Sequence, residues 1–219
     1  NINNFSKFKH KIIYIVADYP QKINFKNHTG GESLVEQHQR NSLSDGLINA
    51  DDNDLVVLSD SDEIPDLTKL KQIKSSTKFT AFSQMMFMYK LNLQNLNESN
   101  WIGSKLCLKK NLPKPQKLRN MKFKNFPFWR LDKKNIQIIS GGWHFSFLQS
   151  PSDIAKKIKS YSHGEFNTQE NVNEKNKEEK IKNNIDVFNR GFNLKKIEID
   201  KRFPNFIVEN KEKLSQWID

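Results

Sequence analysis

A short apolar run that ends in a cluster of carboxylates constrains this chain more than any other feature. Residues 55–58 (LVVL) have the length and composition of a strand covered on both faces, and residues 59–63 (SDSDE) follow at once. Ile64-Pro65 ends the strand, and the apolar spacing over residues 67–73 predicts a short amphipathic helix. This order predicts an α/β fold whose acidic turn lies where open α/β sheets bind ligands.

The acidic turn has two interpretations. Asp60, Asp62, Glu63 and Asp66 repel one another unless a positive group lies among them, and a divalent cation such as Mg²⁺ or Mn²⁺ prefers such oxygen ligands. Asp62 is the first choice as a direct metal ligand, whereas Asp60 would hold a nucleotide ribose or a metal-bound water. Asp62 or Asp66 would instead cap the following helix in the structural interpretation. This segment alone does not separate the two.

Other parts of the chain predict one domain over residues 1–219, in which residues 165–219 form a helical tail. The apolar run at residues 10–16 (HKIIYIV) predicts a further inner strand. Glycines 141 and 142 predict a tight turn between two short strands. The remaining expectations are a helix over residues 32–50, strands over 79–93 and 101–108 around a polar loop at 92–100, a long loop over 111–130, short strands over 136–139 and 143–148, a helix from 150 to 161, and a solvated segment over 170–184.

Charge and cysteine content limit the partners and the compartment. The 36 Lys and Arg residues exceed the 25 Asp and Glu residues by 11, so the surface attracts anions, although scattered lysines are typical of a solvated surface. Cys107 is the only cysteine, which excludes an intrachain disulfide and favours a cytoplasmic setting. No apolar run is long enough to cross a bilayer, so we expect peripheral membrane association at most.

Four ordered motifs resemble one known family. Residues 59–65 (SDSDEIP) are similar to the S-D-x-D-E-I-P signature of glycosyltransferase family 17, the family of β-1,4-mannosyl-glycoprotein β-1,4-N-acetylglucosaminyltransferase. Residues 36–41 (EQHQRN), 141–147 (GGWHFSF) and 162–165 (SHGE) resemble its E-x-x-Q-R, G-G-W-H-x-S and S-H-x-E segments. An earlier strand and a T-F-x-G segment of the family are not found, so the chain resembles an N-terminally incomplete member.

The resemblance implies a GT-A-like, Rossmann-type mixed sheet with flanking helices. It also implies an inverting transfer of a sugar, N-acetylglucosamine, from a nucleotide-diphosphate donor such as UDP-GlcNAc to a glycan or glycolipid hydroxyl, with Mn²⁺ or Mg²⁺ as cofactor. A divalent ion is chemically suited to this reaction because it stabilises the charge that develops on the departing diphosphate. The candidate metal ligands are Asp62, Asp60, His144 and His163.

The remaining candidate site residues follow from what the transfer reaction requires. Inversion needs a base for the acceptor hydroxyl, and Glu63, Asp66 and Glu165 are unranked candidates for it. A guanidinium matches two phosphate oxygens, so Arg40 and Arg130 are possible diphosphate clamps, each with a surface ion pair as the alternative. Trp143 would stack on a sugar ring or pack as a core aromatic.

Two other functions fit parts of the pattern. A metal-dependent nuclease or phosphoesterase would also use clustered carboxylates and a basic surface, but it lacks a second clear metal half-site. A non-catalytic nucleic-acid module rests on net charge alone, without a recognition helix in the sequence pattern. The ordered motifs favour the transferase.

Overall fold

The structure is a computed structural model that describes residues 2–18, 34–124, 135–150, 152–154, 178–181, 183, 185–187 and 189–219. The chain divides into two compact units, which are described separately. Unit 1 comprises Asn1–Val56 and Leu108–Met121, and unit 2 comprises Val57–Cys107 and Lys122–Asp219.

Unit 1 is mainly helical in its described part. The helix predicted over residues 32–50 is present as α1 (Leu34–Ser42) followed by the 3-10 helix η3 (Leu43–Leu47). The long loop predicted from residue 111 is wrong over α2 (Pro115–Asn120), which begins at a proline whose fixed φ suits a first helical position. The other helices of the unit are the 3-10 helices η1 (Ile2–Lys11) and η5 (Lys109–Asn111), and the unit also includes the strand residues Leu55, Val56 and Leu108.

The inner strand predicted over residues 10–16 is wrong. Helix η1 continues to Lys11, and residues 12–18 have no regular secondary structure. Ile13 is 66% exposed and Tyr14 is 79% exposed. A strand needs a neighbouring ladder for its backbone groups, and no described strand of the sheet pairs with this segment. Its β-branched composition is therefore insufficient to place it in the sheet.

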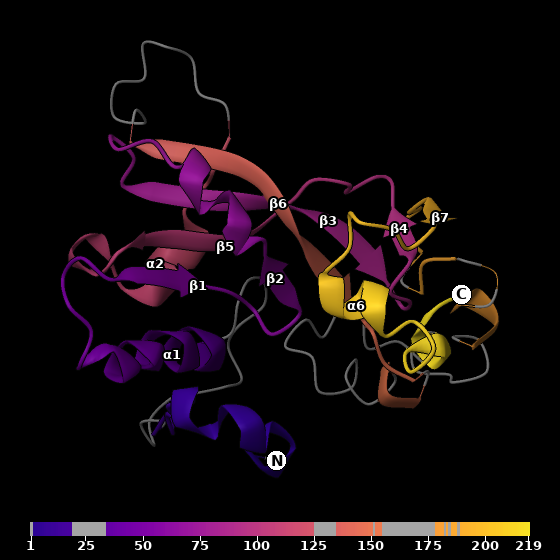
Figure 1. The fold of residues 1–219 in the computed structure, drawn as a ribbon, viewed down its shortest axis with the longest axis horizontal. Coiled ribbons are helices and arrows are strands. Elements are labelled where there is room, and N and C mark those ends of the chain that lie inside the picture. Colours follow the sequence, from indigo (N-terminus) through magenta and orange to yellow (C-terminus); the bar gives the residue numbers. More distant parts are fainter. Residues whose placement is uncertain are drawn as a thin grey trace. The chain divides into compact units, whose positions relative to one another are not determined.

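A seven-stranded mixed sheet confirms the α/β class (Figure 1). Its main path runs β1-β5-β3-β4-β7, and β6 pairs in parallel with β3 and antiparallel with β2. The strands are β1 (Leu55–Leu58), β2 (Glu63–Pro65), β3 (Phe79–Met88), β4 (Leu93–Asn95), β5 (Trp101–Leu108), β6 (Ile136–Ser146) and β7 (Leu194–Lys196). The predicted strand over 101–108 is confirmed as β5, and the one over 79–93 is confirmed as β3 as far as Met88, beyond which residues 89–92 form bends and turns. Strand β4 occupies part of the predicted polar loop.

Strand β1 forms where it was predicted but is not covered on both faces. It lies at the end of the strand order, with β5 as its neighbour, and Leu55 is 50% exposed. A terminal strand has less of the sheet and its covering elements around it, so an apolar run there stays partly in solvent. The acidic turn therefore follows an edge strand.

Strand β6 is continuous through the two glycines, so the predicted tight turn is wrong. It pairs with β3 on both sides of them, and the register shifts between Ser83 and Met85, as in a β-bulge. Gly142 has a φ of +113°, and a Cβ there would lie 2.5 Å from the carbonyl oxygen of Ile64. The missing side chain lets β2 approach β6 closely.

Alternate residues of β3 and β6 build two apolar clusters. Phe87 and Phe145 stack at 5.4 Å between ring centroids, and Phe203 lies 5.2 Å from Phe87. The chain end contributes to this cluster through α6 (Asn205–Glu209) and the 3-10 helix η8 (Ser215–Trp217). The intervening residues Met86 and Met88 belong to a different cluster.

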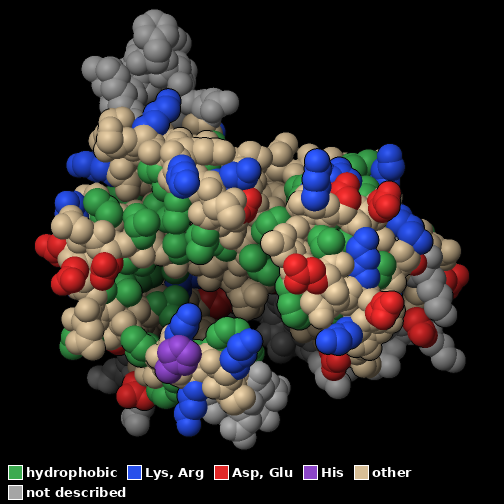
Figure 2. Space-filling view, viewed as in Figure 1, with side chains coloured by type: hydrophobic (Ala, Val, Ile, Leu, Met, Phe, Trp, Pro, Cys, Tyr) green, Lys and Arg blue, Asp and Glu red, His purple; other side chains and the backbone are tan. Residues whose placement is uncertain are grey.

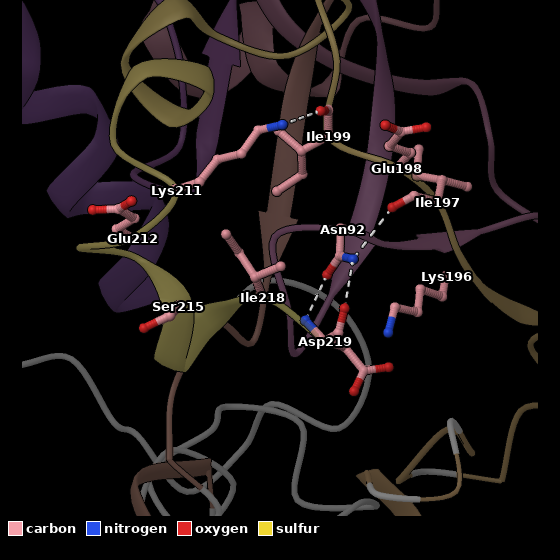
Figure 3. Close-up of a pocket in the computed structure, with 10 residues that line it drawn as sticks. All are labelled: Asn92, Lys196, Ile197, Glu198, Ile199, Lys211, Glu212, Ser215, Ile218 and Asp219. Atoms are coloured by element: carbon pink, nitrogen blue, oxygen red, sulfur yellow. Dashed lines mark hydrogen bonds between the residues drawn. The ribbon is translucent and has the colours of Figure 1, made fainter.

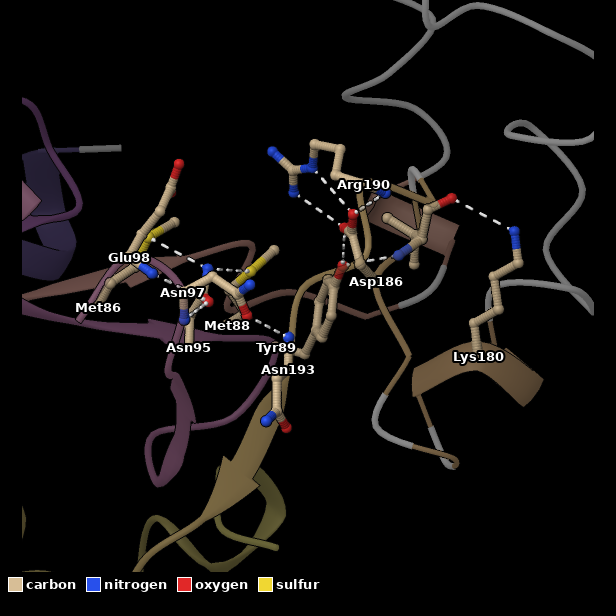
Figure 4. Close-up of polar contacts among 11 residues, drawn as sticks. Met86, Met88, Tyr89, Asn95, Asn97, Glu98, Lys180, Asp186, Arg190 and Asn193 are labelled. Atoms are coloured by element: carbon tan, nitrogen blue, oxygen red, sulfur yellow. Dashed lines mark hydrogen bonds and ion pairs between the residues drawn. The ribbon is translucent and has the colours of Figure 1, made fainter.

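The second cluster carries an ion pair between the buried Asp186 and the exposed Arg190, which we call the Asp186 cluster (Figure 4). The carboxylate of Asp186 accepts bonds from the Arg190 guanidinium at 2.9 Å and from the Tyr89 hydroxyl at 3.3 Å. The same hydroxyl accepts the Val187 amide at 3.0 Å. Burial raises the pKa of the Tyr89 phenol, and the Asp186 charge adds to that shift. These bonds fix the segment after residue 185 to the end of β3.

Basic side chains do not gather in one stripe on the described residues of the face in Figure 2, where Lys and Arg are interspersed with Asp and Glu. The helices in the described ranges are all too short or too polar to cross a bilayer.

Candidate functional site

The acidic turn (residues 59–63) is held by hydrogen bonds between its own residues. The Glu63 amide donates to the Asp60 carbonyl at 3.0 Å, and the Asp60 amide donates to Glu63 Oε2 at 3.3 Å. The Ser59 hydroxyl donates to the Glu63 carbonyl at 2.8 Å. These reciprocal bonds give the carboxylates of the turn a fixed backbone, which a ligand site requires.

Pairing of β2 with β6 brings His144 to this turn. Glu63 is the register partner of His144, and the Phe145 amide donates to the Asp62 carbonyl at 2.9 Å. His144 Nε2 lies 3.5 Å from Asp62 Oδ2. Two motifs that are about 80 residues apart in sequence therefore meet across one pair of strands.

The imidazole of His144 is buried and incompletely satisfied. The side chain of His144 is 8% exposed, whereas that of Asp62 is 31% exposed. His144 Nδ1 is buried without a hydrogen-bond partner. An unsatisfied buried polar atom costs about 1–3 kcal/mol, and one explanation for it is a ligand or water that completes the site. The ring nitrogen that faces the Asp62 carboxylate is Nε2.

Trp101 is a site residue that the sequence analysis did not identify. Its indole Nε1 donates to Glu63 Oε1 at 2.8 Å, and Glu63 is only 5% exposed. Its ring centroid lies 4.8 Å from that of His144, at an interplanar angle of 45°. Trp101 begins β5 after a polar loop, and an aromatic residue at a strand start carries no sequence signal for this role.

A chain of polar side chains continues from the turn into the sheet. The hydroxyls of Ser59 and Ser104 lie 2.6 Å apart, and Gln84 Nε2 donates to Ser104 Oγ at 3.1 Å. Gly103 makes this possible, because a Cβ there would lie 1.9 Å from Gln84 Oε1. The turn is thus connected to β5 and β3 by side-chain bonds.

Asp66 is a helix cap. It precedes the 3-10 helix η4 (Leu67–Gln72), and its Oδ1 accepts the Thr68 amide at 3.1 Å and the Thr68 hydroxyl at 2.6 Å. The capping interpretation is therefore confirmed for Asp66. Asp62 instead lies beside His144.

The other candidates lie elsewhere or outside the described residues. Trp143 donates its indole N–H to the Arg202 carbonyl at 2.9 Å. It packs against the apolar cluster of Phe87, Phe145 and Phe203, which we call the Phe87 cluster. Because adjacent strand residues point to opposite faces, its side chain leaves β6 on the side away from His144. Arg40 belongs to unit 1, where it donates to Gln116. Arg130, His163 and Glu165 lie outside the described residues.

The donor atoms fit part of a metal site. Carboxylate oxygen and imidazole nitrogen both suit Mn²⁺, and Mg²⁺ or Mn²⁺ bound with a nucleotide needs only one or two protein ligands beside the phosphates. Asp62 and His144 supply such a pair. Within the described part of the chain, no group of three or more His, Cys, Asp or Glu side chains is arranged for a metal ion.

A pocket of about 670 Å³ lies in another part of unit 2 (Figure 3). Its floor includes Asn92, which bonds to the backbone of Asp219 and Ile197. None of the candidate site residues lines it. Because it lacks the carboxylate and imidazole pair, we keep the acidic turn as the candidate site. The pocket is lined by Asn92, Lys196, Ile197, Glu198, Ile199, Lys211, Glu212, Ser215, Ile218 and Asp219.

Comparison with known proteins identifies the family. The model of glycosyltransferase family 17 matches residues 1–194, which include the acidic turn, Trp101 and His144. The search of curated proteins and the search of solved structures gave no match. Because the family match spans most of the chain, this chain belongs to glycosyltransferase family 17 and has a role in glycosyl transfer.

Proposed function

We propose that the chain is a metal-dependent, inverting glycosyltransferase with a GT-A-like fold. In this proposal it transfers N-acetylglucosamine from a UDP-linked donor to a hydroxyl of a glycan or glycolipid. The observation that supports the site is the meeting of Asp62 with His144, whose buried Nδ1 has no hydrogen-bond partner. The family match supports the reaction class.

The proposed metal ligands are Asp62 and His144, with Asp60 placed by the same turn to bind the donor ribose or a metal-bound water. The metal would supply positive charge to the diphosphate leaving group. His163 is a further proposed ligand outside the described residues. The cytoplasmic setting stays a proposal, which rests on Cys107 being the only cysteine of the sequence.

The base of the reaction is to be chosen among Glu63, Asp66 and Glu165. Both carboxylate oxygens of Glu63 accept hydrogen bonds, which suits it to hold the turn. The bonds of Asp66 to Thr68 use Oδ1 alone. Conversion of each carboxylate to its amide separates them, because loss of the base lowers kcat while donor binding persists.

Calorimetric titration with Mn²⁺ and a panel of nucleotide sugars tests the proposal. We expect donor binding that requires Mn²⁺ and that weakens at least tenfold in Asp62→Asn. The matched control is Asp200→Asn, since Asp200 is a surface residue bonded to Arg202. Absence of Mn²⁺-dependent binding to any nucleotide sugar would refute the proposed function, and equal binding by the two variants would refute the role of Asp62.

A further inference from the structure

We propose that Trp101 is a positioning residue that fixes the Asp60 backbone and the imidazole beside Asp62 through two separate contacts. This inference rests on the proposed function, because it assigns Trp101 to the residues that support the metal and diphosphate site. Trp101 lies on β5, outside the motifs that carry the family resemblance.

The first contact acts through Glu63. The indole N–H of Trp101 occupies Glu63 Oε1 at 2.8 Å, which leaves Oε2 directed to the Asp60 amide at 3.3 Å. A buried carboxylate keeps one orientation only when its oxygens are bonded, so the indole selects the rotamer of Glu63 that closes the turn. The backbone position of Asp60 therefore depends on the Trp101 N–H.

The second contact acts through His144. The indole and the imidazole lie 4.8 Å apart with tilted planes, and this contact limits rotation of the imidazole about its Cβ–Cγ bond. The same imidazole presents Nε2 to Asp62 Oδ2 at 3.5 Å. Thus the ring of Trp101, and not its N–H, holds the imidazole that faces the Asp62 carboxylate.

The strand around Trp101 is shaped for a large indole. A Cβ on Gly103 would lie 2.9 Å from Trp101 Cδ1, so the glycine leaves the volume that the indole ring occupies. The Gln84 side chain also lies next to Gly103, and it donates to Ser104, whose hydroxyl is hydrogen-bonded to that of Ser59. The indole consequently lies between the hydrogen-bonded side chains of Gln84 and Ser104 and the imidazole of His144.

The two contacts make separable predictions for two substitutions. Trp101→Phe keeps an aromatic ring beside His144 and removes the N–H, so it should release Glu63 and the Asp60 amide. Trp101→Leu should release His144 as well. Substitution of residues that orient metal ligands typically weakens metal binding by roughly 10–100-fold. We expect Mn²⁺ affinity to fall by about tenfold in Trp101→Phe and further in Trp101→Leu.

The matched control is Trp217→Phe. Trp217 undergoes the same chemical change in the same unit, but it packs against the Phe87 cluster. Isothermal titration with Mn²⁺ alone, and then with UDP-GlcNAc in Mn²⁺, measures both affinities in each variant. Affinity of Trp101→Phe within twofold of Trp217→Phe would overturn the inference, provided that the unaltered chain binds Mn²⁺.

A second measurement keeps the inference testable if the proposed function fails. In a ¹H–¹⁵N spectrum without metal, the indole signal assigned to Trp101 should move in Glu63→Gln, and the Asp60 amide signal should move in Trp101→Phe but not in Trp217→Phe. Absence of Mn²⁺ binding by the unaltered chain would refute the metal site alone. An unchanged Asp60 amide signal in Trp101→Phe would refute the positioning role by itself.

Discussion

The Asp186 cluster and the acidic turn each contain a buried carboxylate, but they satisfy it differently. Asp186, 2% exposed, is bonded by the guanidinium and backbone of Arg190, four residues along the chain, and by Tyr89. Glu63, 5% exposed, is bonded by an indole from β5 and by a backbone amide of the turn. The Asp186 carboxylate is bonded to an opposite charge, whereas the described bonds to the Glu63 carboxylate come from a neutral indole and a backbone amide.

The difference indicates which cluster is built for structure and which for chemistry. In the Asp186 cluster the described bonds fix a segment to β3, and substitution there should act on stability. Beside the acidic turn, His144 keeps a buried nitrogen unsatisfied, and substitution there should act on binding more than on stability. Four predictions follow in order of decreasing effect.

Arg190→Ala should have the largest effect. It leaves the buried Asp186 carboxylate without its guanidinium. Removal of one partner of a fully buried ion pair costs about 3–5 kcal/mol, and the lower end of this range is expected because the Arg190 side chain is 33% exposed. Urea unfolding of the variant measures this loss. Adding Asp186→Asn to Arg190→Ala should recover part of it, because no charge is then buried. A loss below about 1 kcal/mol would show that the pair contributes no more than a surface ion pair.

His144→Leu should separate binding from stability. Mn²⁺-dependent donor affinity should fall by roughly 10–100-fold, as for loss of a group at a metal site. The free energy of unfolding should stay within about 1 kcal/mol of the unaltered chain, because the substitution also removes an unsatisfied buried nitrogen. Calorimetry and urea unfolding on one preparation give both values. A loss of stability as large as that of Arg190→Ala would remove the distinction between the two clusters.

Gly103→Ala, behind the acidic turn, and Gly191→Ala, in the Asp186 cluster, compare the loss of stability when a methyl group is added in each region. A Cβ on Gly103 meets Gln84 Oε1 at 1.9 Å, so overpacking should cost about 1–3 kcal/mol and loosen the polar chain behind the turn. Gly191, next to Arg190, has a φ of +76° and nothing within 4 Å, so only backbone strain of about 1 kcal/mol is expected. Thermal unfolding orders the two variants, and a larger loss at Gly191 would contradict the steric argument.

Alkaline pH should give the smallest effect, through the buried Cys107 thiol of unit 2. Burial raises its pKa from 9.0 to about 11. Below pH 9 the thiol is protonated in both states, and above it the unfolded chain ionises first, so this contribution to stability is lost between pH 9 and 11. The loss should be about 1 kcal/mol from pH 9 to 10. The stability of Cys107→Ala, measured by urea unfolding, should not show this loss between pH 9 and 11. If the variant and the unaltered chain lose the same stability over this range, the Cys107 contribution is contradicted.

Local pattern predicted several elements because their causes are local. Apolar alternation located β5 over residues 101–108, and the turn-spaced Leu43 and Leu47 indicated the helical segment that is present as α1 and η3. The same reasoning failed for residues 10–16, where strand formation depends on a pairing partner. It also failed at Gly142, because a positive φ serves a turn and a bulge equally well, and the β3 ladder decides between them.

The candidate site was predictable only in part. Asp62 and His144 were named from motifs, and the structure brings these two together. Trp101 was not predicted, because it contacts residues of β2 and β6, and the residues near it in sequence give no sign of these contacts. Arg40 was named beside them, but its described bond lies within unit 1.

The sequence by itself determined the family, the α/β class and the chemical groups of the acidic turn, since these depend on residue type and order along the chain. Only the tertiary structure decided which groups meet. Asp66 and Asp62 look alike in sequence, yet a helix start makes one a cap, and strand pairing places the other at 3.5 Å from a buried imidazole. Long-range pairing assigns these roles because a side chain's chemistry depends on its neighbours in space.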